Sequence, residues 1–184
     1  MKKILSLAFL LMLSLSVFAQ RQVTKFLGIP IDGSRTDMIE ELKDKGFTEE
    51  KYGDGLEGQF NGKDVTIYVQ TNNNKVWRIA VKYGCCFDKG DIKIQYNRLI
   101  NQFSNNPRYK VVKAEGLTDE DDIDYEVGVN KKQYQSTFYQ LPDDENIKNR
   151  VVWFTFSENP FKSQIYDIVI FYENKYNEAN GDDL

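Results

Sequence analysis

The sequence predicts an α+β fold in which one antiparallel sheet is built from two helix-plus-three-strand-meander units, with the helices packed on one face. Two observations lead to this prediction. Apolar and polar residues alternate in several short segments, which is typical of strands with one buried face. Segments with helical spacing precede two groups of these strands. The alternation is clearest at 75–83 (KVWRIAVKY) and 164–172 (QIYDIVIFY), which we expect to organise the sheet.

The first twenty residues have the features of a secretory signal peptide. Lys2 and Lys3 precede an apolar run, and Ala19 closes a cleavage site made of small residues. No later segment is apolar enough to act as a stop-transfer anchor. We therefore expect a signal peptide at 1–19, no membrane anchor after its cleavage, and an exported protein that is periplasmic or extracellular. An uncleaved N-terminal anchor is the alternative, which the shortness of the apolar run disfavours.

Residues 20–173 are expected to form a single α+β domain, because a chain of this length can bury a core. A polar tail that frays is expected at 174–184. The order helix, strand, strand, strand occurs twice, which predicts pseudo-repeats at about 26–84 and 85–173. An internal duplication would explain this order, and the alternative is that amphipathic meanders resemble one another.

The first unit begins with a short apolar segment at 26–31, which Pro30 restricts to an edge strand or an extended arm. A helix is expected over 35–45. Ser34 can cap its first turn, apolar residues follow at helical spacing, and Gly46 suits a left-handed C-cap. Both ends of this helix are therefore marked in the sequence.

A meander of three strands is expected after this helix. Segments 56–60 and 64–70 flank Asn61-Gly62, and Asn-Gly between strand-like runs is the strongest short signal for a hairpin. The third strand is 75–83. The residues of this strand that we expect to face the helices are Trp77, Ile79, Val81 and Tyr83.

The second unit begins with the clearest helix of the chain. Asp88 is a good N-cap, a helical stripe follows it, and the segment 104–107 (SNNP) ends the helix. The stripe consists of Ile92, Tyr96, Leu99, Ile100 and Phe103. The strands expected after this helix are 109–113, 125–129, 132–140, 150–157 and 164–172, with a charged loop at 115–124 and another loop at 141–149.

The run of motifs from FLGIPIDGS through MIEELKDKGF to LEGQFNGKDVTIYVQTNNNKVWRIAVKY resembles a group of small exported proteins from Bacteroidetes. The resemblance covers the first half of the chain best, and its motifs are structural: a turn, a helix cap and a hairpin. The helix-plus-meander repeat is also similar to the beta-lactamase-inhibitor-protein group and to small outer-membrane assembly lipoproteins. This second likeness rests on the order of elements, so it transfers no functional residues.

The composition of the chain limits the kinds of catalysis and binding that it can support. The chain has no His, which removes the commonest general base near neutral pH and the commonest metal ligand. Without Lys2 and Lys3, 22 basic residues face 28 acidic ones, and this net charge of −6 disfavours nucleic-acid binding. No glycine-rich phosphate loop, nucleophile elbow or zinc-protease motif occurs. We expect no cofactor, and an enzyme would have to use carboxylates.

The pair of adjacent cysteines and an acidic run could each be a functional site, but we expect neither to be one. Cys85 and Cys86 are the only cysteines and are adjacent, so they cannot link distant parts of the chain. We interpret them as thiols, with a vicinal or intermolecular disulfide as the redox alternatives and metal binding least favoured. The acidic run at 119–124 suggests calcium, but Val127 stands where an EF-hand loop needs Gly. We therefore expect a solvated loop and no metal site.

The most informative feature is an asymmetry between the two faces of the predicted sheet. In the first unit, the face away from the helices is mostly polar, whereas in the second unit it carries large apolar residues. Such a surface calls for a cover or a partner. The candidate binding residues are Val151, Trp153, Ile165, Val169 and Phe171, with Tyr134 and Phe138 as an extension of this face. The alternatives are a cover by the tail, the 141–149 loop or the N-terminal arm, and a shifted register that exchanges the faces.

We therefore expect a non-enzymatic exported binding module that recognises a protein or a cell-envelope component through this sheet face, near Trp153 and Phe171. A carrier of a small apolar or aromatic ligand, held between the sheet and the loops, is the first alternative, and a deep pocket lined by aromatic residues would favour it. A carboxylate-based hydrolase is the second alternative, which would need two carboxylates that face each other in a cleft.

Overall fold

The structure is a computed structural model and describes residues 21–84 and 86–181. The expected signal peptide at 1–19 and Cys85 lie outside the described residues. The strands are β1 (Lys25–Phe26), β2 (Ile29–Pro30), β3 (Thr48–Glu49), β4 (Leu56–Phe60), β5 (Lys63–Asn72), β6 (Lys75–Tyr83), β7 (Tyr109–Lys113), β8 (Gln135–Gln140), β9 (Arg150–Asn159) and β10 (Lys162–Asn174). The helices are α2 (Arg35–Asp44), α3 (Lys89–Ser104) and α4 (Ile123–Gly128), with 3-10 turns η1 (Ile147–Asn149) and η2 (Lys175–Asn177).

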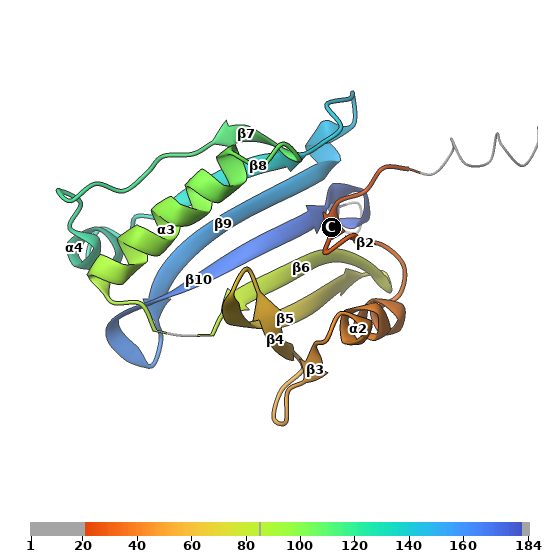
Figure 1. Cartoon of the computed structure of the whole chain (residues 1–184), viewed down its shortest axis with the longest axis horizontal. Helices are drawn as coiled ribbons and strands as arrows, with labels where there is room; N and C mark the ends of the chain where they lie inside the picture. Colours follow the sequence, from red (N-terminus) through yellow and green to blue (C-terminus); the bar gives the residue numbers. More distant parts are fainter. Residues whose placement is uncertain (1–20, 85, 182–184) are drawn as a thin grey trace, which may run out of the picture.

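The fold is α+β, as the sequence predicts. In the described part of the chain, eight strands form one antiparallel sheet in the order β3-β4-β5-β6-β10-β9-β8-β7, and β1 and β2 form a separate hairpin (Figure 1). Each half of the sheet follows one helix: α2 precedes β3 to β6, and α3 precedes β7 to β10. Each half contributes four adjacent strands: β3 adds to the expected meander at one edge of the sheet, and β7, the strand expected at 109–113, lies at the other edge. An internal duplication stays a prediction.

One face of the sheet, here called the inner face, carries most of the hydrophobic core. Residues that stand opposite one another in antiparallel neighbours point to the same face. Pairing of five adjacent strands, β5, β6, β10, β9 and β8, therefore places alternate residues of each strand on this face. Each of these residues is at most 7% exposed. The inner face consists of Val65, Ile67, Val69, Ile79, Val81, Tyr83, Ser136, Phe138, Val152, Phe154, Phe156, Ile168, Ile170 and Tyr172.

Helix α3 packs on the inner face through aromatic rings. The ring of Tyr96 contacts Phe154 and Phe156 edge-on, with centroid separations of 5.2 Å in both cases. The ring of Phe103 stacks on Phe138 at 5.1 Å and on Phe154 at 5.6 Å. Figure 1 shows α3 lying along the half of the sheet made by β7 to β10, so this helix shields the second half of the core.

Both long helices begin at their predicted caps. The side chain of Ser34 accepts a hydrogen bond from the backbone N–H of Asp37, and Asp88 caps α3 in the same way. Helix α2 contacts β5 and β6 and buries Met38 and Leu42, which belong to the same cluster as the inner face. The local signals of the sequence are thus sufficient to place the start of each helix.

A β-bulge in β6 corrects the predicted position of Trp77. Gln70 of β5 pairs with Arg78, whereas the next residue, Thr71, pairs with Val76, so Trp77 is an extra residue in the ladder. Val76 is fully buried, but Trp77 is only half-buried, and its ring lies 3.9 Å from the Arg78 guanidinium carbon. The bulge shifts the alternation by one residue, which the sequence pattern does not reveal.

The segment 125–129, expected as a strand, forms the end of helix α4, with Val129 as its C-cap. The side chain of Asp122 caps this helix by accepting from the backbone N–H of Tyr125, and Ile123 is fully buried in the core. Alternation over five residues is a weak signal, and the Asp122 cap together with the burial of Ile123 outweighs it. Strand β8 accordingly begins at Gln135, later than predicted.

The chain after β10 begins differently from the fraying tail that the sequence predicts. Asn174 is fully buried, and its side-chain amide donates to the carbonyl oxygen of Ile31 at 2.7 Å. Asn177, in η2, donates to the carbonyl oxygen of Val76 at 2.8 Å. These amides tie the end of the sheet to the N-terminal arm and to β6, so the first residues of the segment are part of the domain.

Arg150, at the start of β9, is a buried cation that holds several loops together. It is 1% exposed, donates to the carbonyl oxygens of Gln140 at 3.0 Å and of Pro142, and pairs with the carboxylate of Asp144 at 2.9 Å. It also approaches the carbonyl oxygen of Gln22 at 3.5 Å. One side chain therefore fixes the 140–144 loop beside the N-terminal arm.

We expect Arg150→Met to lower the free energy of unfolding by about 3 kcal/mol, because it leaves buried carbonyl groups without donors. Urea denaturation of the variant and the wild type would measure the difference. The control is Arg98→Met, at an exposed arginine of α3, which should change stability by less than about 0.5 kcal/mol. Equal effects of the two changes would contradict a structural role for Arg150.

Candidate functional site

The face of the sheet opposite the inner face, here called the outer face, holds most of the predicted binding residues. Phe171 stands opposite Trp153 and Ala80, Val169 opposite Thr155 and Lys82, and Val151 opposite Glu173. The outer face consists of Thr66, Tyr68, Gln70, Arg78, Ala80, Lys82, Thr137, Tyr139, Val151, Trp153, Thr155, Val169, Phe171 and Glu173. The predicted apolar patch around Trp153 and Phe171 therefore forms.

The outer face is open in comparison with the inner face. Val151, Trp153, Val169 and Phe171 are all half-buried, whereas the inner-face residues beside them in sequence are buried. The contrast indicates that no packed layer covers the outer face in the described part of the chain.

A cation lies among the aromatic rings of the outer face. The rings of Trp153 and Phe171 stack with centroids 4.2 Å apart and an interplanar angle of 23°. The guanidinium carbon of Arg78 lies 3.9 Å from the ring centroid of Trp77, 5.0 Å from that of Phe171 and 5.9 Å from that of Trp153. The first two distances are typical of cation–π contacts, so Arg78 joins β6 to the apolar patch of β9 and β10.

The carboxylate of Glu173 neutralises this cation. Glu173 is 1% exposed, and its Oε1 accepts from Arg78 Nε and from Trp153 Nε1, both at 2.8 Å. Its Oε2 pairs with Lys175 Nζ at 2.7 Å. Each oxygen has at least one donor, which is what a buried carboxylate requires. The arrangement stabilises the sheet and leaves no unpaired group for acid–base chemistry.

The extension of the patch by Tyr134 and Phe138 is wrong, because both residues face the core. Phe138 stands opposite Val152 on the inner face and is fully buried. Tyr134 is 9% exposed and stacks on Phe156, with centroids 5.3 Å apart. Ile165 is half-buried in an irregular stretch where the register between β10 and β9 shifts, so it has no partner strand residue. The pairing of β8 with β9 sets the face of Phe138, and alternation along the sequence alone does not reveal it.

Several acidic residues at 119–124 make hydrogen bonds within the chain, and the described cysteine lies at the surface. Asp121 accepts from the backbone N–H of Thr118 at 2.7 Å, and Asp122 caps α4. Asp124 accepts from the hydroxyl of Tyr166 at 2.7 Å. Cys86 is exposed. Among the described residues, no three or more potential metal-ligating side chains converge.

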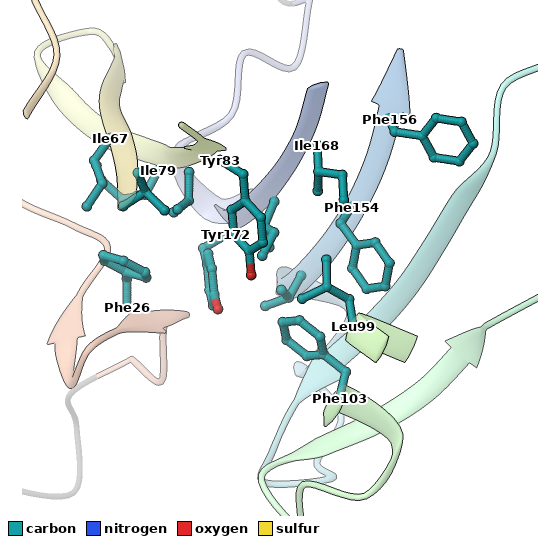
Figure 2. Close-up of a cluster of buried hydrophobic side chains, with 14 of the residues drawn as sticks. Phe26, Ile67, Ile79, Tyr83, Leu99, Phe103, Phe154, Phe156, Ile168 and Tyr172 are labelled. Atoms are coloured by element: carbon teal, nitrogen blue, oxygen red, sulfur yellow. The ribbon is translucent and has the colours of Figure 1, made fainter. Parts of the chain in front are cut away.

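A cavity of about 880 Å³ lies on the other side of the sheet, over the inner face of β10. Its floor includes Ile170 and Tyr172, and α3 contributes Leu99 and Phe103. Figure 2 shows Phe26 on one side, Leu99 and Phe103 on the other, and the ring of Tyr172 between them. The remaining apolar lining comes from Val23, Leu27, Phe60, Tyr109, Leu141 and Pro142.

The rim of the cavity is rich in amide side chains. They are Gln22, Gln59, Asn61, Gln102, Asn106 and Gln140. At the floor, burial and a hydrogen bond with Tyr109 raise the pKa of the Tyr172 hydroxyl well above its usual value, so it stays neutral. The described lining contains no carboxylate, which argues against a carboxylate hydrolase at this site.

The N-terminal hairpin closes one side of the cavity. Its backbone is held at Lys25, whose N–H donates to Gln140 Oε1 at 2.7 Å and whose carbonyl accepts from Gln140 Nε2 at 3.0 Å. The turn places Leu27 at φ +51° and Gly28 at φ +86°. A leucine in this left-handed conformation costs about 1–2 kcal/mol. Positive φ at both residues is the usual geometry of a two-residue hairpin turn, and this turn places Leu27, which is 41% exposed, at the cavity wall.

The sequence pattern does not predict where the cavity lies, although a pocket for a small ligand was one of the alternatives. The aromatic residues that line the cavity are not those of the predicted patch. They come from β4, α3, β7 and β10, which are far apart in the sequence. The segment 104–107, which was expected to end a helix, and the loop expected at 141–149 border the cavity, and neither pattern specifies one.

Comparisons with known proteins place no constraint on this site. No family model, no curated protein and no solved structure matches the chain. Within the described ranges, no helix combines the length and the apolar character that crossing a bilayer requires.

We expect both tryptophans to be accessible to acrylamide, a neutral quencher, because Trp77 and Trp153 are each half-buried on the open side of the sheet. The single-tryptophan variants Trp77→Phe and Trp153→Phe would be measured by fluorescence quenching. Each should be quenched more than a buried indole and less than the urea-unfolded chain. Full protection of the remaining tryptophan in either variant would show that the outer face is covered.

Proposed function

We propose that this chain is a non-enzymatic exported binding protein that carries a small ligand with a largely apolar body in the cavity over β10. The supporting observation is the cavity itself, whose volume of about 880 Å³ lies within the range of about 300–1,000 Å³ of small-molecule sites. An apolar floor with a few polar groups at the rim is the usual construction of such sites. Export rests on the expected signal peptide, which lies outside the described residues.

The shape of the site favours carriage over chemistry. Tyr172 and Ile170 at the floor are buried and uncharged, and Leu99 and Phe103 add apolar surface, so a ligand would gain mainly by leaving water. The described lining offers neither a paired carboxylate nor a nucleophile with an adjacent base. These groups bind a ligand without changing it.

We expect Gln102→Trp to weaken binding of the apolar fluorescent dye Nile red by at least about tenfold, because an indole on α3 would occupy the mouth of the cavity. The matched control is Asn101→Trp, one residue earlier on the same helix, which is exposed and outside the lining. Fluorescence titration would measure both. No dye binding to the wild type, or equal binding by both variants, would contradict the proposed function.

A second candidate function is protein recognition through the outer face. The observation that favours it is a half-exposed row in which Trp153 stands beside Phe171, and Ala80 separates Phe171 from Tyr68. Aromatic residues of this kind dominate protein interfaces. This candidate is weaker than the carrier, because Arg78 and Glu173 already satisfy each other within the face.

A photo-crosslinking residue at Thr155, beside this row, should form a defined product with a partner protein in cells if the outer face is an interface. Trp153→Ala combined with Phe171→Ala should abolish that product, because the anchoring rings are removed. The control position is Asn101 on α3. Products that persist in the double variant, or that are the same from both positions, would exclude the outer face as the interface.

A further inference from the structure

The charged groups at the cavity are of one sign. In a chain with 28 acidic and 24 basic residues, the charged side chains of the described lining are Lys25 and Arg108, and both are basic. The other polar side chains of the rim are amides and tyrosines, which can donate hydrogen bonds. The mouth of the cavity is therefore locally positive in a protein whose net charge is negative.

Arg108 is positioned at the cavity by the side-chain amide of Asn106 and not by a carboxylate. Asn106 Oδ1 accepts from the backbone N–H of Arg108 at 3.1 Å and from its Nε at 3.4 Å. The charge of Arg108 lowers the pKa of the buried Tyr172 hydroxyl, against the larger effect of burial, so its field reaches the cavity floor. The guanidinium is exposed at the mouth and retains donors for another acceptor.

Neither basic residue of the cavity has a carboxylate partner. Among the described residues, no Asp or Glu forms a salt bridge with Lys25 or Arg108. Lys110, two residues after Arg108 and outside the lining, does have such a partner and pairs with Asp143 at 2.6 Å. Both cations of the described lining are thus available for a ligand, and no carboxylate of that lining competes for them.

We propose that the cavity binds amphiphilic anions, molecules with one acidic head, carboxylate or phosphate, on an apolar body. The inference rests on the proposed function and specifies its ligand class. The apolar body lies over Ile170 between α3 and the N-terminal hairpin, and the head meets Arg108 and Lys25 at the mouth. A planar guanidinium matches the paired oxygens of either head, and an ammonium adds a second donor.

The test compares ligands that share one alkyl chain and differ in the head. Isothermal titration calorimetry would measure binding of dodecanoate, dodecyl phosphate, dodecanol and dodecyltrimethylammonium to the mature chain, below the concentrations at which they form micelles. We expect both anions to bind at least about tenfold more tightly than the alcohol, and the cation more weakly still. The stronger of the two anions identifies the preferred head. Added salt should weaken binding of the anions and leave the alcohol unchanged.

Arg108→Gln should reduce the affinity for the preferred anion by about tenfold and leave the affinity for dodecanol unchanged. The matched control is Lys110→Gln, which removes the same charge from the same strand region outside the cavity and should have no effect. Thermal unfolding of both variants checks that the fold is retained, because both side chains are exposed.

The outcomes separate the two proposals. If dodecanol and the anions bind equally and Arg108→Gln changes nothing, the acidic head is not recognised, and the inference is overturned while the carrier function stands. If Lys110→Gln weakens the anions as much as Arg108→Gln does, the attraction belongs to the whole surface, and the inference is again overturned. If none of the ligands binds, the carrier function fails together with the inference.

Discussion

The pairing of β6 with β10 is the constraint on which the rest of the structure depends. It joins the two halves of the chain, with Val81 opposite Ile170 near its middle. Each half by itself would expose an unpaired strand edge and a half-covered apolar face, both of which favour aggregation. The pairing removes both edges at once and makes the inner face continuous from β5 to β8, so a single core forms instead of two small ones.

The central position of the β6–β10 pairing in the sheet also explains why the cavity lies where it does. Helix α3 packs toward β7 and β10, and α2 packs toward β5 and β6. Neither helix therefore covers the whole inner face above this pair of strands. The N-terminal hairpin and the 140–142 loop close part of the remaining space. Gln140 and the buried Arg150 hold these two segments together. The same contacts that complete the core therefore build one wall of the proposed ligand site.

The two faces of the sheet differ in how their polar groups are satisfied. On the outer face, Glu173 pairs with Arg78 and with Lys175, and Lys175 also pairs with Glu178, so two acids face two cations. At the cavity, Lys25 and Arg108 have no such acid in the described part of the chain. A charge that the fold does not neutralise is available to a ligand, and this difference decides which face is the better candidate for binding a small molecule.

The sequence by itself determined the local structure. The caps at Ser34 and Asp88, the Asn-Gly hairpin and the period-two segments fixed the class of the fold, most of its elements and the outer patch of Trp153 and Phe171. Capping, turn chemistry and alternation act between residues that are close along the chain, so one sequence suffices to detect them.

Only the tertiary structure decided the features that depend on distant contacts. The bulge at Trp77 and the inward side of Phe138 follow from how neighbouring strands pair, because alternation shows which residues share a face but not where its phase shifts. The cavity is assembled from segments between Gln22 and Tyr172 that meet only in the folded chain. The shape of such a space depends on packing between elements, and no local pattern encodes it.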